Sequence, residues 1–169
     1  MAKIYGNTTT TPIKPTDSPS LKKKRLINQI TLTENAAVSF NKDKNGKSFE
    51  LEQFEILVSH PAVTSVKYGV WVGINDVAMA QTGNTSATAA NPTWKIWGEQ
   101  DEFSGWDIKS VLNNTNGANS GNVIAYPNGH RYIGTPPKSA TKITVASNAA
   151  LSSALTSGTV VTLWGVDAK

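Results

Sequence analysis

Apolar and polar residues alternate over short stretches along most of the chain after residue 25. In residues 26–33, for example, the last apolar residues share one parity and the threonines the other, which is typical of a strand with one buried face. Similar stretches recur at short intervals. The strands predicted in this way cover residues 26–33, 36–40, 49–58, 65–74, 77–80, 93–97, 106–112, 122–126, 130–134, 142–146 and 160–166.

The stretch 49–58 contains a change of phase. Phe49 and Leu51 share one parity, whereas the apolar residues from Phe54 to Val58 have the other. Side chains on a strand alternate between its two faces, so one residue has to be absorbed if all of these side chains are to point into one core. We therefore predict a bulge or a strand break near residues 52–53.

Turn-forming pairs of the types Asn-Gly, Asn-Pro, Pro-Pro and Ser-Gly separate many of the predicted strands. The best helical candidate is one or two turns at residues 149–155. Many short strands with turns between them indicate an all-β fold. We predict an antiparallel, jelly-roll-like β-sandwich formed by residues 26–169 and preceded by an extended N-terminal arm of residues 1–25.

Composition narrows the classes of function. The 169 residues suffice for one domain and include no cysteine, which excludes a disulfide scaffold, a thiolate metal site and a cysteine nucleophile. The chain has no P-loop, dinucleotide fingerprint or nucleophile elbow, and we interpret His60 and His130 as loop hydrogen-bonders. We therefore expect a non-enzymatic protein without a cofactor. Because it has neither a bilayer-spanning apolar run nor the apolar centre of a signal peptide, we expect no membrane partner.

The net charge of +4 is unevenly distributed. Nine lysines and arginines and three acidic residues lie in residues 1–48, whereas the rest of the chain is slightly acidic. The first 20 residues are rich in threonine and proline and poor in large apolar side chains, so we expect them to become ordered only against a neighbouring subunit. The residues assigned to this assembly arm are Lys14, Leu21, Lys22, Lys23, Lys24 and Arg25.

The basic run LKKKR at residues 21–25 has three interpretations. It is a solubilising edge before the first strand, a contact with an acidic neighbouring subunit, or a contact with nucleic acid. Four adjacent cations without interleaved aromatic residues are a thin signal for nucleic acid, so the sequence favours the first two interpretations.

The loop of residues 41–52 has the spacing of a calcium loop. Asn41, Asp43, Asn45 and Glu52 occupy its positions one, three, five and twelve. However, the first ligand lacks a charge, three lysines lie in the loop, and the flanks resemble strands rather than helices. The preferred interpretation is a hairpin with its turn at Asn45-Gly46. The four residues are kept as a weak metal candidate.

Three tryptophans are candidates for contact with a glycan, because indole rings stack on sugar rings. They are Trp94, Trp97 and Trp106, and carboxylates lie close to them in residues 99–107. An exposed acidic loop is the preferred interpretation, a sugar-binding surface comes second, and glycoside hydrolysis comes last. Trp94 and Trp97 lie three positions apart, so on a strand they point to opposite faces.

The C-terminal sequence SGTVVTLWGV at residues 157–166 resembles the last strand of β-sandwich domains in bacteriophage virion proteins. The patterns ELEQF-ILV at residues 50–58 and YGVWVGIN at residues 68–75 fit the same order of features. The resemblance implies a jelly-roll-like sandwich used for assembly or attachment, often as a trimer. It implies no catalytic residues.

The leading hypothesis is therefore a non-enzymatic structural protein of a virion: a capsid decoration, head-fibre, tail or receptor-binding component. Its expected partners are copies of itself, other virion proteins contacted through residues 1–25, and a glycan on the host surface. One alternative is a small jelly-roll coat protein whose basic arm contacts nucleic acid. The other is a carbohydrate-binding module.

Overall fold

The computed structural model describes residues 23–62, 69–82, 90–100, 105–115, 123–126, 137–147 and 154–168. Ten strands are found in these residues, and they confirm every predicted strand except 130–134, which lies outside them. The helical candidate lies mostly outside them as well, and Leu155 at its end forms a bridge with Ala36. The strands are β1 Arg25–Thr31, β2 Val38–Phe40, β3 Leu51–Ser59, β4 Val70–Ile74, β5 Val77–Gln81, β6 Ala90–Gln100, β7 Trp106–Thr115, β8 Val123–Tyr126, β9 Ile143–Ser147 and β10 Val160–Asp167.

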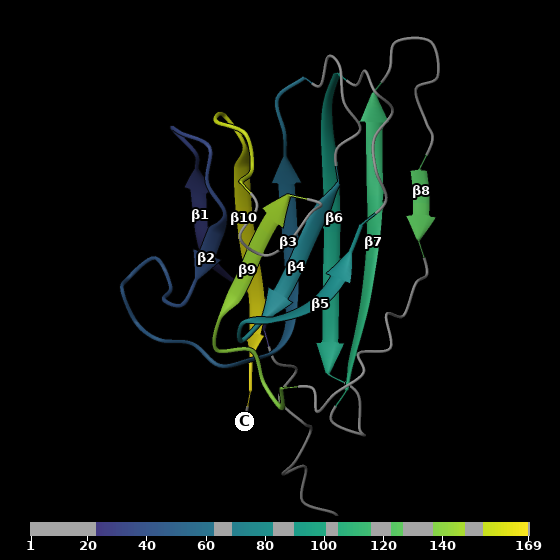
Figure 1. Cartoon of the computed structure of the whole chain (residues 1–169). Helices are drawn as coiled ribbons and strands as arrows, with labels where there is room; N and C mark the ends of the chain where they lie inside the picture. The colour runs from purple at the N-terminus through teal and green to yellow at the C-terminus, as the bar shows by residue number, and fades with distance from the viewer. Residues whose placement is uncertain are drawn as a thin grey trace, which may run out of the picture.

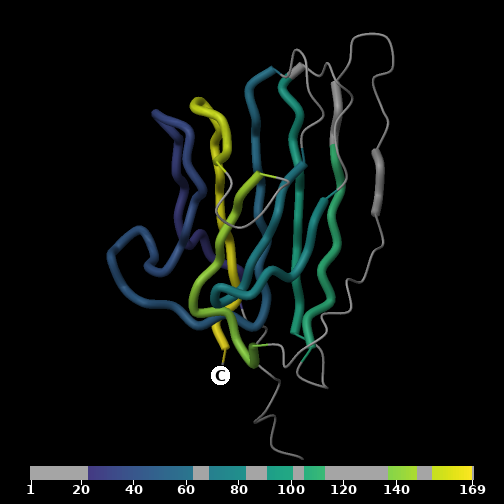
Figure 2. The backbone as a smooth tube through the Cα atoms, in the orientation of Figure 1, coloured from purple at the N-terminus to yellow at the C-terminus, as the bar shows by residue number. Residues whose placement is uncertain are grey.

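The strands form two antiparallel sheets that pack face to face (Figure 1). One sheet has six strands in the order β1-β10-β3-β6-β7-β8, and the other has four in the order β2-β9-β4-β5. The chain changes sheet repeatedly, as the backbone trace shows (Figure 2). This arrangement confirms the predicted all-β, antiparallel sandwich. Among the described residues, no helix has the length and apolar character needed to cross a membrane.

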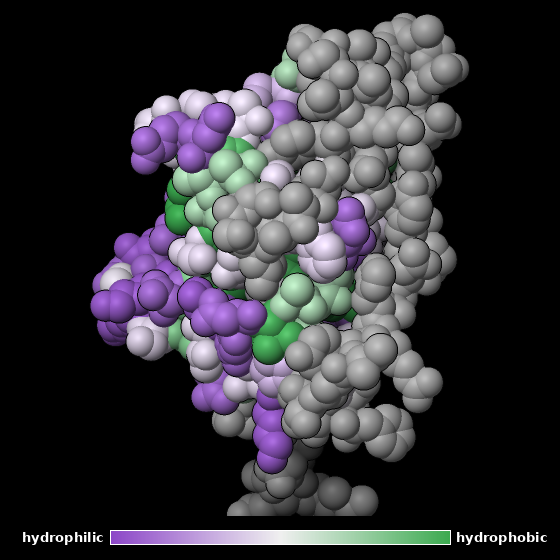
Figure 3. Space-filling model, viewed as in Figure 1, coloured by the Kyte–Doolittle hydropathy of each residue, from purple (hydrophilic) through white to green (hydrophobic). Residues whose placement is uncertain are grey.

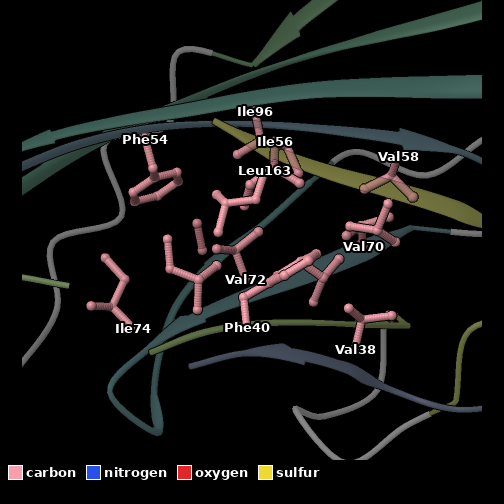
Figure 4. Close-up of a cluster of buried hydrophobic side chains, with 14 of the residues drawn as sticks. Val38, Phe40, Phe54, Ile56, Val58, Val70, Val72, Ile74, Ile96 and Leu163 are labelled. Carbon is pink, nitrogen blue, oxygen red and sulfur yellow. The ribbon is translucent and has the colours of Figure 1, made fainter. Parts of the chain in front are cut away.

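The core fills the space between the two sheets (Figure 4). Phe40 and Val72 come from the four-stranded sheet, and Ile56, Ile96 and Leu163 face them from the six-stranded sheet. Each of these side chains is almost completely buried. The inner faces of β1–β7, β9 and β10 thus supply the core, while alternate residues stand on the outer face.

The predicted bulge is present in β3. Val166 pairs with Gln53 but the next residue, Asp167, pairs with Leu51, so β3 has one residue more than β10 at this point. The extra residue lets Leu51 and Phe54 both point into the core, since both are buried. The bulge therefore lies near residues 52–53, where the change of phase in the sequence predicted it.

The turn between β2 and β3 differs from the prediction. Gly46 has a φ of 77°, and the Asp43 N–H donates to the Lys47 carbonyl at 2.7 Å, so a tight turn does form. However, β2 and β3 belong to different sheets. The predicted hairpin is thus wrong, because the turn connects the two layers instead of two paired strands. Hydrophilic side chains gather over this part of the surface (Figure 3).

Asn75 and Asp76 form a two-residue hairpin turn between β4 and β5, with φ angles of 49° and 67°. Positive φ at both positions is the type I′ geometry that suits the twist of paired strands. The Asn75 side chain also accepts the N–H groups of Thr141 and Lys142, each at 2.9 Å. This turn therefore fixes the segment that leads into β9.

Candidate functional site

The outer face of the six-stranded sheet carries a row of cross-strand neighbours. Trp164 on β10 pairs with Glu55 on β3, and Glu55 pairs with Trp97 on β6. The inward residues of β6 include Trp94, which is fully buried, so Trp97 stands on the outer face as the spacing predicted. Two half-buried tryptophans thus flank one glutamate on the outside of the sandwich.

A groove of about 340 Å³ follows this row. We call it the tryptophan groove. Its floor includes the backbone of Gly98 and Gly165, whose missing Cβ atoms would point inward against Phe54 and Leu51. Trp164 adjoins the groove through Lys24, which is one of its lining residues. The lining residues are Lys24, Gln53, Phe54, Glu55, Lys95, Trp97, Gly98, Glu99, Gly165 and Val166.

Glu55 lies between two lysines. The Lys24 Nζ is 2.8 Å from Glu55 Oε2, and the Lys95 Nζ is 3.4 Å from Oε1. Burial pushes the pKa of Glu55 upward, but the hydrogen bond and charge of Lys24, together with Lys95, outweigh it and lower the pKa. Glu55 is therefore ionised at neutral pH, and it holds both lysines over the sheet.

Each lysine also lies close to a tryptophan. The Lys24 Nζ is 6.0 Å from the centre of the Trp164 ring, and the Lys95 Nζ is 5.9 Å from the Trp97 ring. These distances are at the outer limit of a cation–π contact, which is weak at exposed sites. Both lysine side chains are 51% exposed, so they can leave the rings at small cost.

The structure separates the three tryptophans predicted to contact a glycan. Trp94 is fully buried, and Trp106 is 7% exposed with its Nε1–H donating to the Pro137 carbonyl at 2.7 Å. Neither ring offers a face to solvent, so these two residues serve the fold. Trp97 alone of the three lies in the groove, and its contact with a glycan remains a prediction.

Sequence reasoning missed Trp164 and Glu55 as parts of this surface. The sequence around Trp164 is strongly apolar, which favours a buried position for this residue. Trp164 alternates with Val161, Leu163 and Gly165 of the inner face, but its outward neighbours Thr162 and Val166 are buried as well, so parity alone does not reveal its exposure. The position of Glu55 between the two rings depends on strand pairing, which no local pattern reveals.

Three charged residues join the start of β1 to the end of β10. The Arg25 guanidinium donates to both oxygens of Asp167, each at 2.8 Å, and to Asp43 Oδ2 at 3.2 Å. We call this group the terminal clamp. The hydrogen bonds to Asp167 are the main reason that the pKa of Arg25 is raised. Since Arg25 starts β1 and Asp167 ends β10, the clamp holds the first and last strands together.

The terminal clamp and Glu55 show that part of the basic run LKKKR contacts its own chain. Lys14, Leu21 and Lys22 lie outside the described residues, and Lys23 is exposed. Lys24 and Arg25 are bound to carboxylates of the same chain. Arg25 also pairs with Gly165 in the sheet, so the strand begins one residue before the predicted domain boundary.

The candidate metal loop uses Asp43 for the turn. Its Oδ1 accepts the N–H groups of Asn45 and Lys47 at 2.9 and 3.0 Å, and its Oδ2 faces Arg25. The N–H of Lys47 is the main cause of the lowered pKa of Asp43. Both oxygens are thus engaged by donors that a cation would have to replace. Within the described ranges, no group of three or more His, Cys, Asp or Glu side chains is placed to hold a metal ion.

His60 is buried at the end of β3, where its ring packs edge-on against Trp94 at 6.2 Å. Its Nδ1 lies 2.6 Å from the Pro61 carbonyl oxygen, which can only accept, so Nδ1 carries the proton. Burial lowers the pKa of His60 below 6.5, although the contact with Pro61 opposes this.

The buried imidazole predicts a pH dependence of stability. The unfolded chain binds a proton near pH 6.5 and the folded chain only at lower pH, so the free energy of unfolding should fall as the pH drops below 6.5. Urea unfolding of the chain and of His60→Gln between pH 7 and about 5 measures this effect. The variant should show a shallower slope, and equal slopes would contradict the assignment.

No family model, curated protein or solved structure matches the chain significantly.

Proposed function

We propose that this chain is a non-enzymatic structural and attachment protein of a bacteriophage virion, held in the particle by its N-terminal segment. The candidate positions are capsid decoration, head fibre, and tail or receptor-binding component. The proposal takes its virion setting from the resemblance of residues 157–166 to virion sandwich strands. Trimers, the form that the resemblance implies, remain part of the proposal.

One observation supports the division into a body and an anchor: residues 27–166 supply a core that fills the space between the two sheets. The terminal clamp closes the sandwich at Arg25, directly after the N-terminal segment. This arrangement supports a body that is stable by itself. The anchoring role of the preceding segment rests on its composition, because residues 1–20 are rich in threonine and proline and poor in large apolar side chains.

The positions of the chain ends support the same division of roles. Because β1 and β10 are antiparallel neighbours, the start of the body at Arg25 lies beside Gly165 near its C-terminal end. In Figure 1 the C-terminus lies at the lower end of the sandwich. Attachment through residues 1–22 would then fix this end to the particle and leave the opposite end free.

The alternative, a nucleic-acid-binding arm, receives less support. Of the four cations in LKKKR, Lys24 contacts Glu55, and Arg25 contacts Asp43 and Asp167. A phosphate would have to displace these carboxylates, which repel it. The distribution of charge therefore favours a protein neighbour.

Deleting residues 1–22 tests the anchoring role. The deleted chain should remain folded but should be lost from particles, because the contacts to the neighbouring subunits are removed. Gel analysis of purified particles measures its occupancy. A matched control replaces the segment with a glycine-serine sequence of equal length and should be lost to the same extent. Incorporation of the deleted chain at normal occupancy would contradict the proposal.

A further inference from the structure

We propose that the tryptophan groove, independently of the anchoring segment, binds an extended β-1,4-linked oligosaccharide. Alternate sugar rings stack on Trp164 and Trp97, and the ring between them is hydrogen-bonded to Glu55. The ligand class is a neutral polysaccharide of the cellulose or chitin type.

The spacing of the rings supports this ligand. Trp164 and Trp97 stand in the same cross-strand row with the single strand β3 between them. Neighbouring strands are about 4.8 Å apart, so β10 and β6, which carry the two tryptophans, are separated by about 10 Å. In an extended β-1,4-linked chain, successive rings are turned by half a rotation, and every second ring presents the same face. Two rings that lie one disaccharide repeat apart can therefore meet the two tryptophans.

The polar groups between the tryptophans suit sugar hydroxyls. Glu55 is an ionised acceptor, and the Gln53 amide donates to Glu99 Oε1 at 3.0 Å beside it. Lys24 and Lys95 supply donors on both sides of Glu55. Hydroxyl groups both donate and accept, so they can join this network without leaving a charge unpaired. A volume of about 340 Å³ falls in the range of small-ligand sites.

A flat protein partner fits this face less well. Among the described residues, Leu26 is the one exposed large apolar residue, and it is only 36% exposed. The groove alternates aromatic rings with ion pairs, and a protein surface that excluded water would have to desolvate those charges. An oligosaccharide brings its own hydrogen-bonding groups and leaves the groove open to water.

Isothermal titration calorimetry of the full-length chain with cellohexaose and with chitohexaose tests the proposal. At least one should bind saturably, and maltohexaose, whose α-linked chain curves, should bind at least ten-fold more weakly. Trp97→Ala and Trp164→Ala should each reduce the affinity ten-fold or more. Trp71→Ala is the matched control, because Trp71 is a half-buried tryptophan on β4 of the other sheet. It should leave the affinity unchanged.

Two further measurements keep the test decisive if a tryptophan variant unfolds. Glu55→Gln preserves shape and should weaken binding several-fold while its circular dichroism spectrum stays unchanged. The tryptophan fluorescence of the unaltered chain should shift as ligand is added. The proposal fails if neither β-1,4-linked hexasaccharide binds, or if binding survives both Trp97→Ala and Trp164→Ala. Neither failure affects the anchoring role of residues 1–22, which particle occupancy tests separately.

Discussion

Replacing Trp94 with alanine should lower the free energy of unfolding by about 3–5 kcal/mol, because the change leaves a large cavity in a packed core. Trp94 is fully buried, and its ring contacts His60 edge-on. Domains of this kind are stable by about 5–15 kcal/mol, so the variant would lose a large share of the total. Urea unfolding followed by circular dichroism measures the loss.

Trp97→Ala is the matched control for this prediction. It removes the same side chain from the same strand, three positions further on and on the outer face. The expected loss is about 1 kcal/mol or less, as for most surface substitutions. Equal losses for Trp94→Ala and Trp97→Ala would contradict the assignment of the two faces of β6.

The second large effect is expected at Gly98. A Cβ atom built there would lie 2.5 Å from two carbons of the Phe54 ring. An aromatic ring in a packed core cannot bend away, so Gly98→Ala should cost about 1–3 kcal/mol through overpacking. Gly165→Ala should cost less, since the atom it meets is the flexible end of Leu51.

A double-mutant cycle tests the cause of the effect at Gly98. Phe54→Leu removes the ring, so Gly98→Ala should be better tolerated in that background than in the unaltered chain. Thermal unfolding of the two single variants and the double variant measures the coupling. Additive losses would show that Phe54 is not the reason for glycine at this position.

Much of the fold followed from the alternation of side chains. Every predicted strand within the described residues formed, and the bulge at Glu52 formed where Phe49–Val58 changes phase. Both are local consequences of the period of two. The hairpin at Asn45-Gly46 was wrong because turn residues determine the local bend and do not determine which sheet receives the next strand.

The candidate site was less accessible to sequence reasoning. The placement of Trp94 and Trp97 on opposite faces follows from their distance of three residues and was predicted, but the spacing did not say which of the two is exposed. Glu55 reaches both tryptophans only through the register of β3 with β10 and β6. Pairing between distant strands depends on the whole fold, so the groove could not be found from any one segment.

The basic run at residues 21–25 also depends on partners that are distant in the sequence. The three interpretations of this run were a solubilising edge, a contact with an acidic subunit and a contact with nucleic acid, but Arg25 meets Asp43 and Asp167 of its own chain. These partners divide the run between the sheet and the N-terminal segment. The contacts of the basic run therefore show where the sandwich body begins. The charge pattern of the run in the sequence does not show this.

Thermal unfolding of residues 23–169 beside the full-length chain tests the central claim most directly. A sandwich that needs none of residues 1–22 should unfold cooperatively, with a midpoint within about 2–4 °C of the full-length value, the shift that about 1 kcal/mol produces in a domain of this size. A midpoint lowered by about 10 °C or more, or a transition without cooperativity, would show that the segment belongs to the core and would contradict the account.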